Sequence, residues 1–487
     1  MVGRLRRFVT SGRALVLAPV LVFVALLSWA VSSPAGSSPD EDFHLVSIWC
    51  ATGDEAACIQ EEGATEATVP GALVDVACFA FHTDRSGDCQ DALDFDGEPD
   101  SLTARGNFYG AYPQVFYATM SLFVGPDIEV SVLTMRVVGV LIFTIVATAL
   151  FLLLPRDRRP TLIWSWVVTT VPVGLFVLSS INPSSWAIAG VGFGWLALAG
   201  FFETSGARKI GLAALFAVSV AMAVGSRGDA AMYMVLAILA TVVLQAHRTR
   251  RFAIDAILPL AAVIVCVVMF RVSRPVEHVT QGVEPEAGTA GVLARVLPTI
   301  FDVPRLWMGM FGNAYGLGWL DTAMPAVVGL GSLACFLGAA IVALSRTDVR
   351  KTIVLIGGLA VLWALPTAVL VAADERVGAN MQPRYLLPLL ILFAGVLFWS
   401  PRGELIRFGR AQRILVIVTL GVAQAIALHL NLSRYVSGFD DLGPNLDSGI
   451  EWWWNLPVSP MAVWVGGSLA YVGLVALLIG RDRGVRP

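Results

Sequence analysis

Twelve apolar runs, separated by mostly short polar segments, constrain the fold of this 487-residue chain more than any other feature. They lie near residues 14–33, 131–154, 161–181, 186–202, 210–225, 230–246, 252–270, 325–344, 352–372, 385–399, 414–431 and 460–480. A run of about 20 apolar residues can cross a bilayer as a helix. Because 56% of the residues are hydrophobic and only 14% are charged, we predict an all-α integral membrane protein with about 12 transmembrane helices.

Charged residues predict which side of the membrane each loop faces. Arginine clusters occupy every second loop and both ends of the chain, whereas most acidic residues lie in the alternate loops. Basic loops stay in the cytoplasm, so both termini are expected to be cytoplasmic. The first run could instead be a signal peptide that follows the basic residues 4–13. Its apolar core is long for a signal peptide, which favours a retained membrane anchor.

The same pattern divides the chain into five parts. These are the N-terminus with the first span (1–33), a large exoplasmic loop (34–130), spans two to seven (131–270), a second exoplasmic loop (271–324), and the last five spans with the C-terminus (325–487). The cytoplasmic loops are short and contain no glycine-rich phosphate loop, and no nucleic-acid partner is expected. The active face is therefore predicted to be the exoplasmic one.

Three apolar pieces lie outside the twelve runs. Residues 109–124 are interpreted as an amphipathic helix on the outer surface, since a thirteenth span would reverse the charge pattern of all later loops. Residues 306–320 are interpreted as a similar surface or re-entrant piece. Three tryptophans at 452–454 have the position of an aromatic belt at the membrane interface.

Four of the six cysteines lie in the first exoplasmic loop, where the compartment is oxidising. Four cysteines allow three connectivities, and proximity in the chain favours Cys50–Cys58 with Cys78–Cys89. The remaining two, Cys266 and Cys335, lie inside apolar runs and are expected to be small packing residues.

A polar stretch at 38–44 directly follows the first apolar run and holds three carboxylates and a histidine within five residues. Its spacing is typical of a helix start with a capping box. Ser38 would be the N-cap, Pro39 the first helical residue, and Glu41 the acid three positions after the cap.

On such a helix Asp40, His44 and Ser47 share one face, while Glu41 points toward the opposite, apolar side. The alternative is an ordinary solvated helix start whose acids complement the helix dipole. His44 could orient Asp40 across one helical turn, or it could be a half-exposed interface residue.

Polar and charged groups also gather at the outer ends of later runs. The turns that carry them are Asn182-Pro183-Ser184, Ser226-Arg227-Gly228-Asp229, Gly318-Trp319-Leu320-Asp321-Thr322 and Arg384-Tyr385-Leu386-Leu387-Pro388. An arginine at such a place can simply extend toward the interface. Two arginines on the same side as an acidic helix favour phosphate binding, because the planar guanidinium donates to two oxygens at once.

Together these strings resemble a bacterial membrane family catalogued as domain of unknown function 2142, which is grouped with the C-type glycosyltransferases. The similarity covers roughly 15–400 and rests on Pro39-Asp40-Glu41 with His44, on the Asn182 turn, and on the Gly-Trp-Leu-Asp-Thr and Arg-Tyr-Leu-Leu-Pro strings. The resemblance implies a C-type bundle in the bacterial plasma membrane, with a catalytic acidic pair in the first outer loop.

The resemblance further implies a polyprenyl-phosphate sugar donor and an acceptor in the cell envelope, either a glycan, a glycolipid or a protein. Carried over to this sequence, it makes Asp40 the base and Glu41 its neighbour. The chain departs from the family pattern in two places. Ser184 and Ser185 stand where an acidic residue is expected, and Arg227-Gly228-Asp229 stands where a Lys-Pro-Pro-Tyr-like string is usual.

We therefore expect an inverting glycosyltransferase. The catalytic residues are Asp40 and Glu41; the donor phosphate is bound by Arg384, Arg227 and Tyr385; and the substrate is contacted by His44, Asn107, Tyr109, Tyr112, Asn182 and Asp321. No cofactor is expected, although Asp40 and Asp42 have the spacing of a D-x-D pair that could hold a divalent metal.

Two other classes of protein remain compatible with the sequence. A twelve-span secondary transporter or flippase of lipid-linked sugars would also have both ends inside, but such proteins usually have matching halves with charges at the membrane midplane. A non-catalytic scaffold for envelope assembly is the other alternative. Substitution of Asp40 by asparagine distinguishes the enzyme from both.

Overall fold

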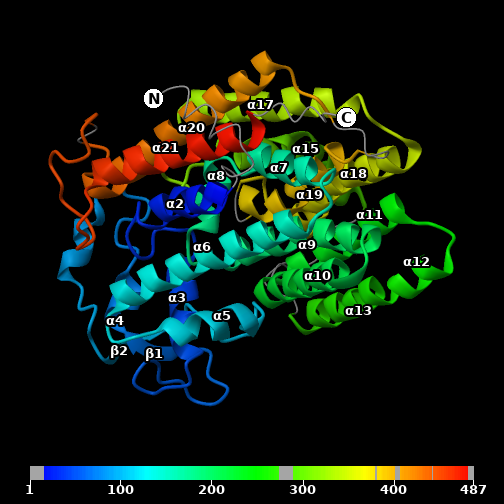
Figure 1. The fold of residues 1–487 in the computed structure, drawn as a ribbon. Coiled ribbons are helices and arrows are strands. Elements are labelled where there is room, and N and C mark those ends of the chain that lie inside the picture. The colour runs from blue at the N-terminus through cyan, green and yellow to red at the C-terminus, as the bar shows by residue number, and fades with distance from the viewer. Residues whose placement is uncertain (1–15, 274–288, 379–380, 401–405, 441–442, 481–487) are drawn as a thin grey trace.

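The computed structural model describes residues 16–273, 289–378, 381–400, 406–440 and 443–480. Within these ranges nine helices are long and apolar enough to cross a membrane. They are α6 (Ile128–Leu153), α9 (Pro183–Glu203), α10 (Gly206–Ser226), α11 (Gly228–Gln245), α12 with α13 (Arg250–Asp255 and Ile257–Val272), α17 (Ala326–Leu344), α18 (Val349–Ala372), α20 (Arg410–Val436) and α21 (Pro460–Ile479). The all-α membrane fold predicted from hydropathy is confirmed (Figure 1).

Each of the other three predicted runs also contains helix, but not one straight, full-length span. The first run forms α2 (Ala18–Ala30), and the run at 385–399 forms η4 (Pro383–Leu386) followed by α19 (Leu387–Leu397). The run at 161–181 is divided into α7 (Arg159–Thr169) and α8 (Pro172–Leu178), which meet at 99°. Pro172 has no N–H to donate and forces the residue before it into an extended backbone, so the chain turns there.

Helix α9 lies at the centre of the bundle and contacts α6, α8, α10, α11 and α19. Small residues allow this close packing: a Cβ atom at Gly190 would lie 2.6 Å from the carbonyl oxygen of Ser219 on α10. In contrast, α13 has many large apolar side chains exposed, among them Leu260 at 62% and Ile264 at 58%. Such a surface is expected to face lipid.

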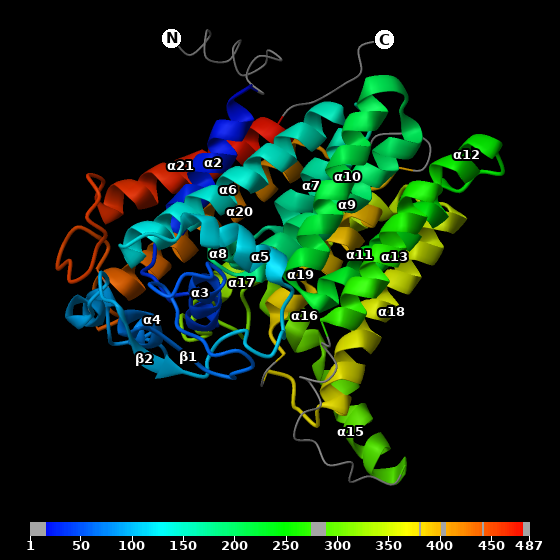
Figure 2. The same cartoon turned by 90° about the horizontal axis from the view of Figure 1, so that it is seen from below.

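The 34–130 segment forms a compact cap at one end of the bundle (Figure 2). It contains α3 (Glu41–Cys50), β1 (Ala67–Pro70), α4 (Gly71–Asp75), η2 (Gly87–Ala92), β2 (Pro99–Thr103), α5 (Gln114–Met120) and η3 (Ser121–Phe123). β1 and β2 pair antiparallel, with Ala67 opposite Thr103, in a small sheet that the sequence did not predict. Both predicted disulfides, Cys50–Cys58 and Cys78–Cys89, are confirmed, and Cys266 and Cys335 are free and buried as expected.

The surface helix predicted at 109–124 is shorter than expected, because only α5 and η3 are helical and α5 buries Phe116, Tyr117 and Met120 against the protein. The second large loop contains α15 (Thr289–Asp302) and α16 (Pro304–Met310). Its residues 274–288 lie outside the described ranges, and the re-entrant interpretation of 306–320 stays a prediction.

The aromatic-belt interpretation of residues 452–454 is wrong for two of the three tryptophans. Trp452 and Trp454 are buried within the protein, and Trp454 Nε1 donates to the carbonyl oxygen of Val31 at 3.0 Å. Trp452 packs directly against Gly87 in η2. These rings therefore join the cap to the bundle.

The arrangement of the elements agrees with the predicted loop pattern. In Figure 2 the start of α2 and the helix α12 lie toward one end of the bundle, whereas α3, α4, β1, β2 and α15 lie toward the other. The basic residues at 4–13 and 481–486 lie outside the described ranges, so the sidedness of the termini stays a prediction.

Candidate active site

Asp40 lies where the cap begins, and its backbone has a left-handed conformation with φ 63°. Helix α3 begins one residue later, at Glu41, while the N–H of Ser38 donates to Glu41 Oε2 at 2.9 Å. The predicted helix start is therefore wrong by two residues, since Asp40 is the N-cap and Pro39 precedes the helix. The left-handed turn costs about 1–2 kcal/mol in a residue with a side chain, so surrounding contacts must hold it.

Two guanidinium groups from distant parts of the chain hold the Asp40 carboxylate. Arg384 Nη2 donates to Oδ2 at 2.7 Å and Arg105 Nη2 to Oδ1 at 3.4 Å. The Arg384 side chain is 4% exposed and that of Asp40 is 33% exposed, so the carboxylate can be reached from one side. Burial alone would raise the pKa of Asp40, but the charges of Arg384 and Arg105 outweigh burial and hold the pKa below its usual value. Asp40 is therefore ionised at neutral pH.

Glu41 is fully buried and pairs with Arg136 of α6, at 3.1 Å between Arg136 Nη2 and Glu41 Oε1. The same guanidinium donates to the carbonyl oxygens of Ala30, Ser33 and Pro34, just after α2. One buried arginine thus ties the end of α2 to the start of α3. Glu41 does point to the apolar side of its helix, as predicted, but it has no exposed surface with which to contact a substrate.

Arg227, between α10 and α11, lies in the same cluster as Arg384. Its Nε and Nη2 atoms donate to the two oxygens of Asp229, each at 2.9 Å. The Arg227 guanidinium lies 4.2 Å from the ring centre of Tyr385 and 5.7 Å from that of Tyr112, and the Arg384 guanidinium lies 5.0 Å from the Tyr385 ring. Tyr385 therefore contacts both arginines. Because the two arginine side chains are 12% and 4% exposed, neither extends freely into solvent.

His44 lies behind Asp40 in an aromatic cluster, not half-exposed at an interface. Its Nδ1 is 2.9 Å from the hydroxyl oxygen of Tyr117, and its ring centre is 5.2 Å from that of Tyr112. Burial, with the positive charges of Arg384 and Arg227 nearby, lowers the pKa of His44 to about 3. The imidazole is therefore neutral at neutral pH. Burial also raises the pKa of Tyr112 to about 12, so that the phenol keeps its proton.

Asp42 does not form the predicted D-x-D metal pair with Asp40. Its carboxylate is held by Nε and Nη2 of Arg105, whose half-exposed side chain also bonds Asp40. Within the described parts of the chain, no group of three or more His, Cys, Asp or Glu side chains could hold a metal ion. With a guanidinium group between them, the two carboxylates do not fit a divalent cation.

Of the remaining predicted substrate residues, Asn182 lies at the edge of the site. Its side chain caps α9 by accepting from the N–H of Ser184 and donates to the carbonyl oxygen of Pro39 at 3.0 Å. The side chain of Asn107 donates from Nδ2 to the carbonyl oxygen of Tyr112 at 2.8 Å, and its Oδ1 accepts from the N–H of Tyr112 at 2.9 Å. It therefore shapes the loop that presents the Tyr112 ring. Tyr109 is 62% exposed and is not among the ring contacts of this cluster.

Asp321 is not at the site. Its carboxylate pairs with Arg434 of α20 at 3.3 Å and accepts from the N–H of Phe81 at 3.1 Å, which anchors the cap to the bundle. Its neighbour Trp319 is closer to the site, because Trp319 Nε1 donates to the carbonyl oxygen of Gly36 at 2.9 Å and the Arg105 guanidinium lies 5.8 Å from its ring.

Four residues of this region, namely Arg105, Arg136, Tyr117 and Trp319, were not predicted as site residues. The signal for Arg136 was present, since a lone arginine within the apolar run 131–154 requires a partner. For Arg105, in a polar segment, local sequence offers no comparable signal.

The hollow beside Arg384 is small, with a volume of about 20 Å³, and is lined by Pro39, Gln382 and Leu320 among others. Arg384 also donates to the side chain of Gln382. A sugar phosphate would have to displace some of the contacts between arginine and carboxylate in order to enter. The side of the site at Arg384 is therefore closed by its own ion pairs, whereas Asp40 stays partly exposed.

The fold and this cluster define an all-α, multi-pass membrane protein with an ion-paired polar site between its cap and its bundle. The chain belongs to the family described as predicted membrane protein (DUF2142), whose model matches residues 23–393. No curated protein and no solved structure matches the chain. The resemblance in the sequence strings is thus confirmed as family membership, and the relation to C-type glycosyltransferases stays a prediction.

Proposed function

We propose that the protein is a membrane glycosyltransferase of the bacterial plasma membrane. It transfers a sugar from a polyprenyl-phosphate donor to a glycan, glycolipid or protein of the cell envelope. The cap faces the exoplasmic side and both termini face the cytoplasm, in accordance with the positive-inside distribution of charge. Since nucleotide sugars are absent outside the cytoplasm, a lipid-linked donor is required there.

The single observation that carries the proposal is the Asp40–Arg384 pair, with Arg227 joined to it through Tyr385. Asp40 and Arg384 are 344 residues apart in the chain. The fold brings this reachable carboxylate together with two guanidinium groups. Arginine binds phosphate through paired hydrogen bonds. A carboxylate beside a bound phosphate ester can accept a proton from an attacking hydroxyl group.

In the proposed step the donor phosphate takes over the Nη atoms of Arg384 and releases Asp40 from its ion pair. Asp40 then removes the proton of the acceptor hydroxyl, and the acceptor oxygen forms a bond to the anomeric carbon. The bond between that carbon and the phosphate oxygen breaks on the opposite side, so the configuration inverts. The electron pair leaves with polyprenyl phosphate, whose charge is compensated by Arg384 and Arg227.

Loss of the Arg384 partner also makes Asp40 a better base. In the closed site the guanidinium charges hold the Asp40 pKa low, and a low pKa means a weak base. When phosphate neutralises Arg384, the pKa of Asp40 rises toward its ordinary value. Binding of the donor thereby strengthens the base that deprotonates the attacking acceptor.

Neighbouring residues are assigned supporting roles. Glu41 and Arg136 position Asp40 through the buried ion pair, and Glu41 exchanges no proton with substrate. The face formed by Tyr112, together with His44 behind it, offers an aromatic surface on which a sugar ring can stack. Asn182 holds the backbone at Pro39 and so fixes the turn before Asp40.

The test is transfer from a radiolabelled, short-chain polyprenyl-phosphate sugar by the purified protein in nanodiscs, with an envelope extract as acceptor. The Asp40→Asn variant is expected to lose at least about 100-fold in rate, in line with removal of a general base. Asp91→Asn, which alters an exposed carboxylate elsewhere in the cap, is the matched control. Folding of both variants is compared by circular dichroism and gel filtration.

Two results would contradict the proposal. One is equal transfer by the wild type and a folded Asp40→Asn variant. The other is a product with retained anomeric configuration. If the wild type transfers no sugar but moves lipid-linked sugar across a vesicle bilayer, the protein is a flippase instead.

A further inference from the structure

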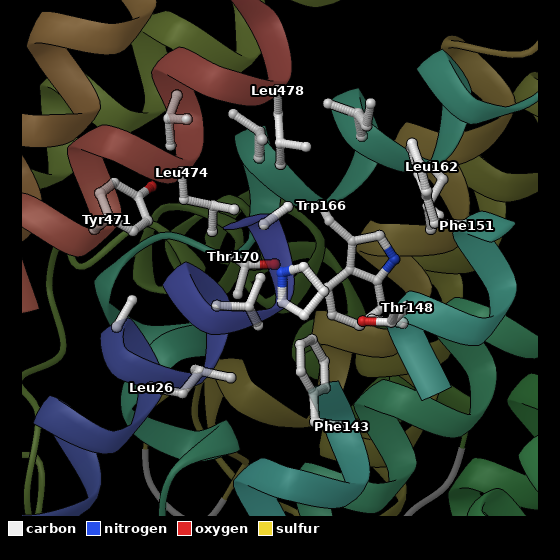
Figure 3. A pocket seen from close by; sticks show the side chains of 18 of the residues that line it. Leu26, Phe143, Thr148, Phe151, Leu162, Trp166, Thr170, Tyr471, Leu474 and Leu478 are labelled. Carbon is white, nitrogen blue, oxygen red and sulfur yellow. The ribbon is translucent and has the colours of Figure 1, made fainter. Parts of the chain in front are cut away.

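A large cavity within the described part of the chain shares no lining residue with the hollow beside Arg384. It has a volume of about 510 Å³ and is enclosed by α2, α6, α7 and α21 (Figure 3). Its walls are almost entirely apolar, with Leu26, Phe143, Trp166 and Leu474 among the side chains that line it. The cavity runs alongside α7 as far as the 99° bend between α7 and α8. The volume is within the range of a small-molecule site.

One end of the cavity is open and the other is closed. The lining residues Val16 and Leu152, at the end nearer the start of α7, are 75% and 60% exposed. At the far end the cavity is closed by Thr170 and Leu175, at the bend. Between these ends α7 runs for 11 residues, or about 16 Å. That length equals roughly half of a hydrocarbon core of about 30 Å, which is the depth of one lipid leaflet.

A positively charged side chain lies at the open end of the cavity. Arg159, the first residue of α7, lines the cavity, and its Nη2 donates to the carbonyl oxygen of Leu152 at 3.1 Å. Its Nε atom is buried and has no hydrogen-bond partner among the described residues. The charges that act on its guanidinium group are those of two more arginines, Arg156 and Arg208. Within the same described ranges no acidic side chain forms a salt bridge with Arg159.

We infer that this cavity is a binding site for one anionic phospholipid. One acyl chain lies along α7 between α2, α6 and α21, and the headgroup phosphate contacts Arg159 at the mouth. The charge of the mouth is complementary to phosphate, and the depth of the cavity suits a chain that enters from one leaflet only. The mouth at Arg159 lies at the end of α7 opposite the bend, and the inference does not depend on the proposed transferase activity.

The whole protein is extracted from nanodiscs made of phosphatidylglycerol. Native mass spectrometry then measures how much lipid stays bound to it. The wild type is expected to retain one phosphatidylglycerol. In Ala147→Trp an indole fills the cavity, and retention is expected to fall at least fivefold. Ile145→Trp places the same indole two residues away on α6, at a position that is 57% exposed, and is expected to retain lipid like the wild type.

A second variant keeps the test decisive if the Ala147→Trp protein fails to fold. In Arg159→Gln the retention of phosphatidylglycerol is expected to fall about tenfold, because one charge-assisted hydrogen bond is lost. Retention of diacylglycerol, which has no phosphate, is expected to stay unchanged. Equal retention by wild type, a folded Ala147→Trp and Arg159→Gln would overturn the inference. So would equal retention of phosphatidylcholine and phosphatidylglycerol, or displacement of the bound phospholipid by polyprenyl phosphate.

Discussion

Replacement of His44 by glutamine should reduce the loss of stability that the wild-type protein suffers in acid. His44 is buried as a neutral imidazole against Tyr117, with a pKa of about 3 in the folded protein against 6.5 in an unfolded chain. Below pH 6.5 the unfolded state binds a proton that the folded state excludes. Stability is therefore full above pH 6.5 and falls as the pH decreases toward 3.

The size of the effect follows from the two pKa values. Each pH unit within this window costs about 1.4 kcal/mol, so the wild type should lose about 2 kcal/mol between pH 8 and pH 5 through His44 alone. Glutamine does not titrate, and it retains a polar atom that can reach the hydroxyl of Tyr117. The variant should thus start less stable at pH 8 but lose about 2 kcal/mol less on acidification.

The assay is the unfolding free energy in mixed detergent micelles, measured at pH 8 and pH 5 for both proteins. His82→Gln is the matched control, because it makes the same substitution at an exposed histidine of the same cap. If wild type and His44→Gln lose the same free energy between the two pH values, the neutral, buried imidazole described above is refuted.

Three further perturbations address the contacts around the cap. Glu41→Gln leaves Arg136 charged and buried with only neutral acceptors. The substitution should therefore lower the unfolding free energy by about 3 kcal/mol. A loss below about 1 kcal/mol in the same micelle assay would argue against a strong ion pair. Replacing Cys78 and Cys89 by serine opens a loop of 11 residues and should cost about 3 kcal/mol, and the reduced wild type is expected to show at least that loss. Arg105→Gln removes half-exposed ion pairs and should change the unfolding free energy by less than about 1 kcal/mol. In that variant a pH titration of the Asp40 carboxyl group should show a raised pKa, because Arg105 helps to lower it; no rise would contradict the described contact.

Local sequence was sufficient where the controlling interactions are local. The helical character of the twelve runs follows from hydropathy, since a peptide group in lipid must find its hydrogen bond within its own helix. Nine of the helices in the described residues are long and apolar enough to cross a membrane. The two disulfides followed from cysteines 8 and 11 residues apart in one segment. Pattern reasoning failed at 161–181, where apolar composition continues through a proline that turns the chain by 99°.

Local sequence was insufficient for the partners of the charged side chains. Asp321 and Arg384 were both predicted from polar strings at the outer ends of apolar runs. Asp321 nevertheless pairs with Arg434 to anchor the cap, whereas Arg384 reaches Asp40. Ser38, Pro39 and Glu41 have good capping-box spacing. Glu41 nevertheless turns inward to a buried arginine, and the helix starts later.

The sequence by itself thus determined the helical membrane fold and the two disulfides of the cap. Apolar runs and short disulfide loops depend on residues that are close together in the chain. Only the tertiary structure decided which carboxylate faces which guanidinium, and which of two adjacent acids stays within reach of a substrate. The physical reason is that a buried charge must be paired, and the partner for each is supplied by whichever distant helix packs beside it.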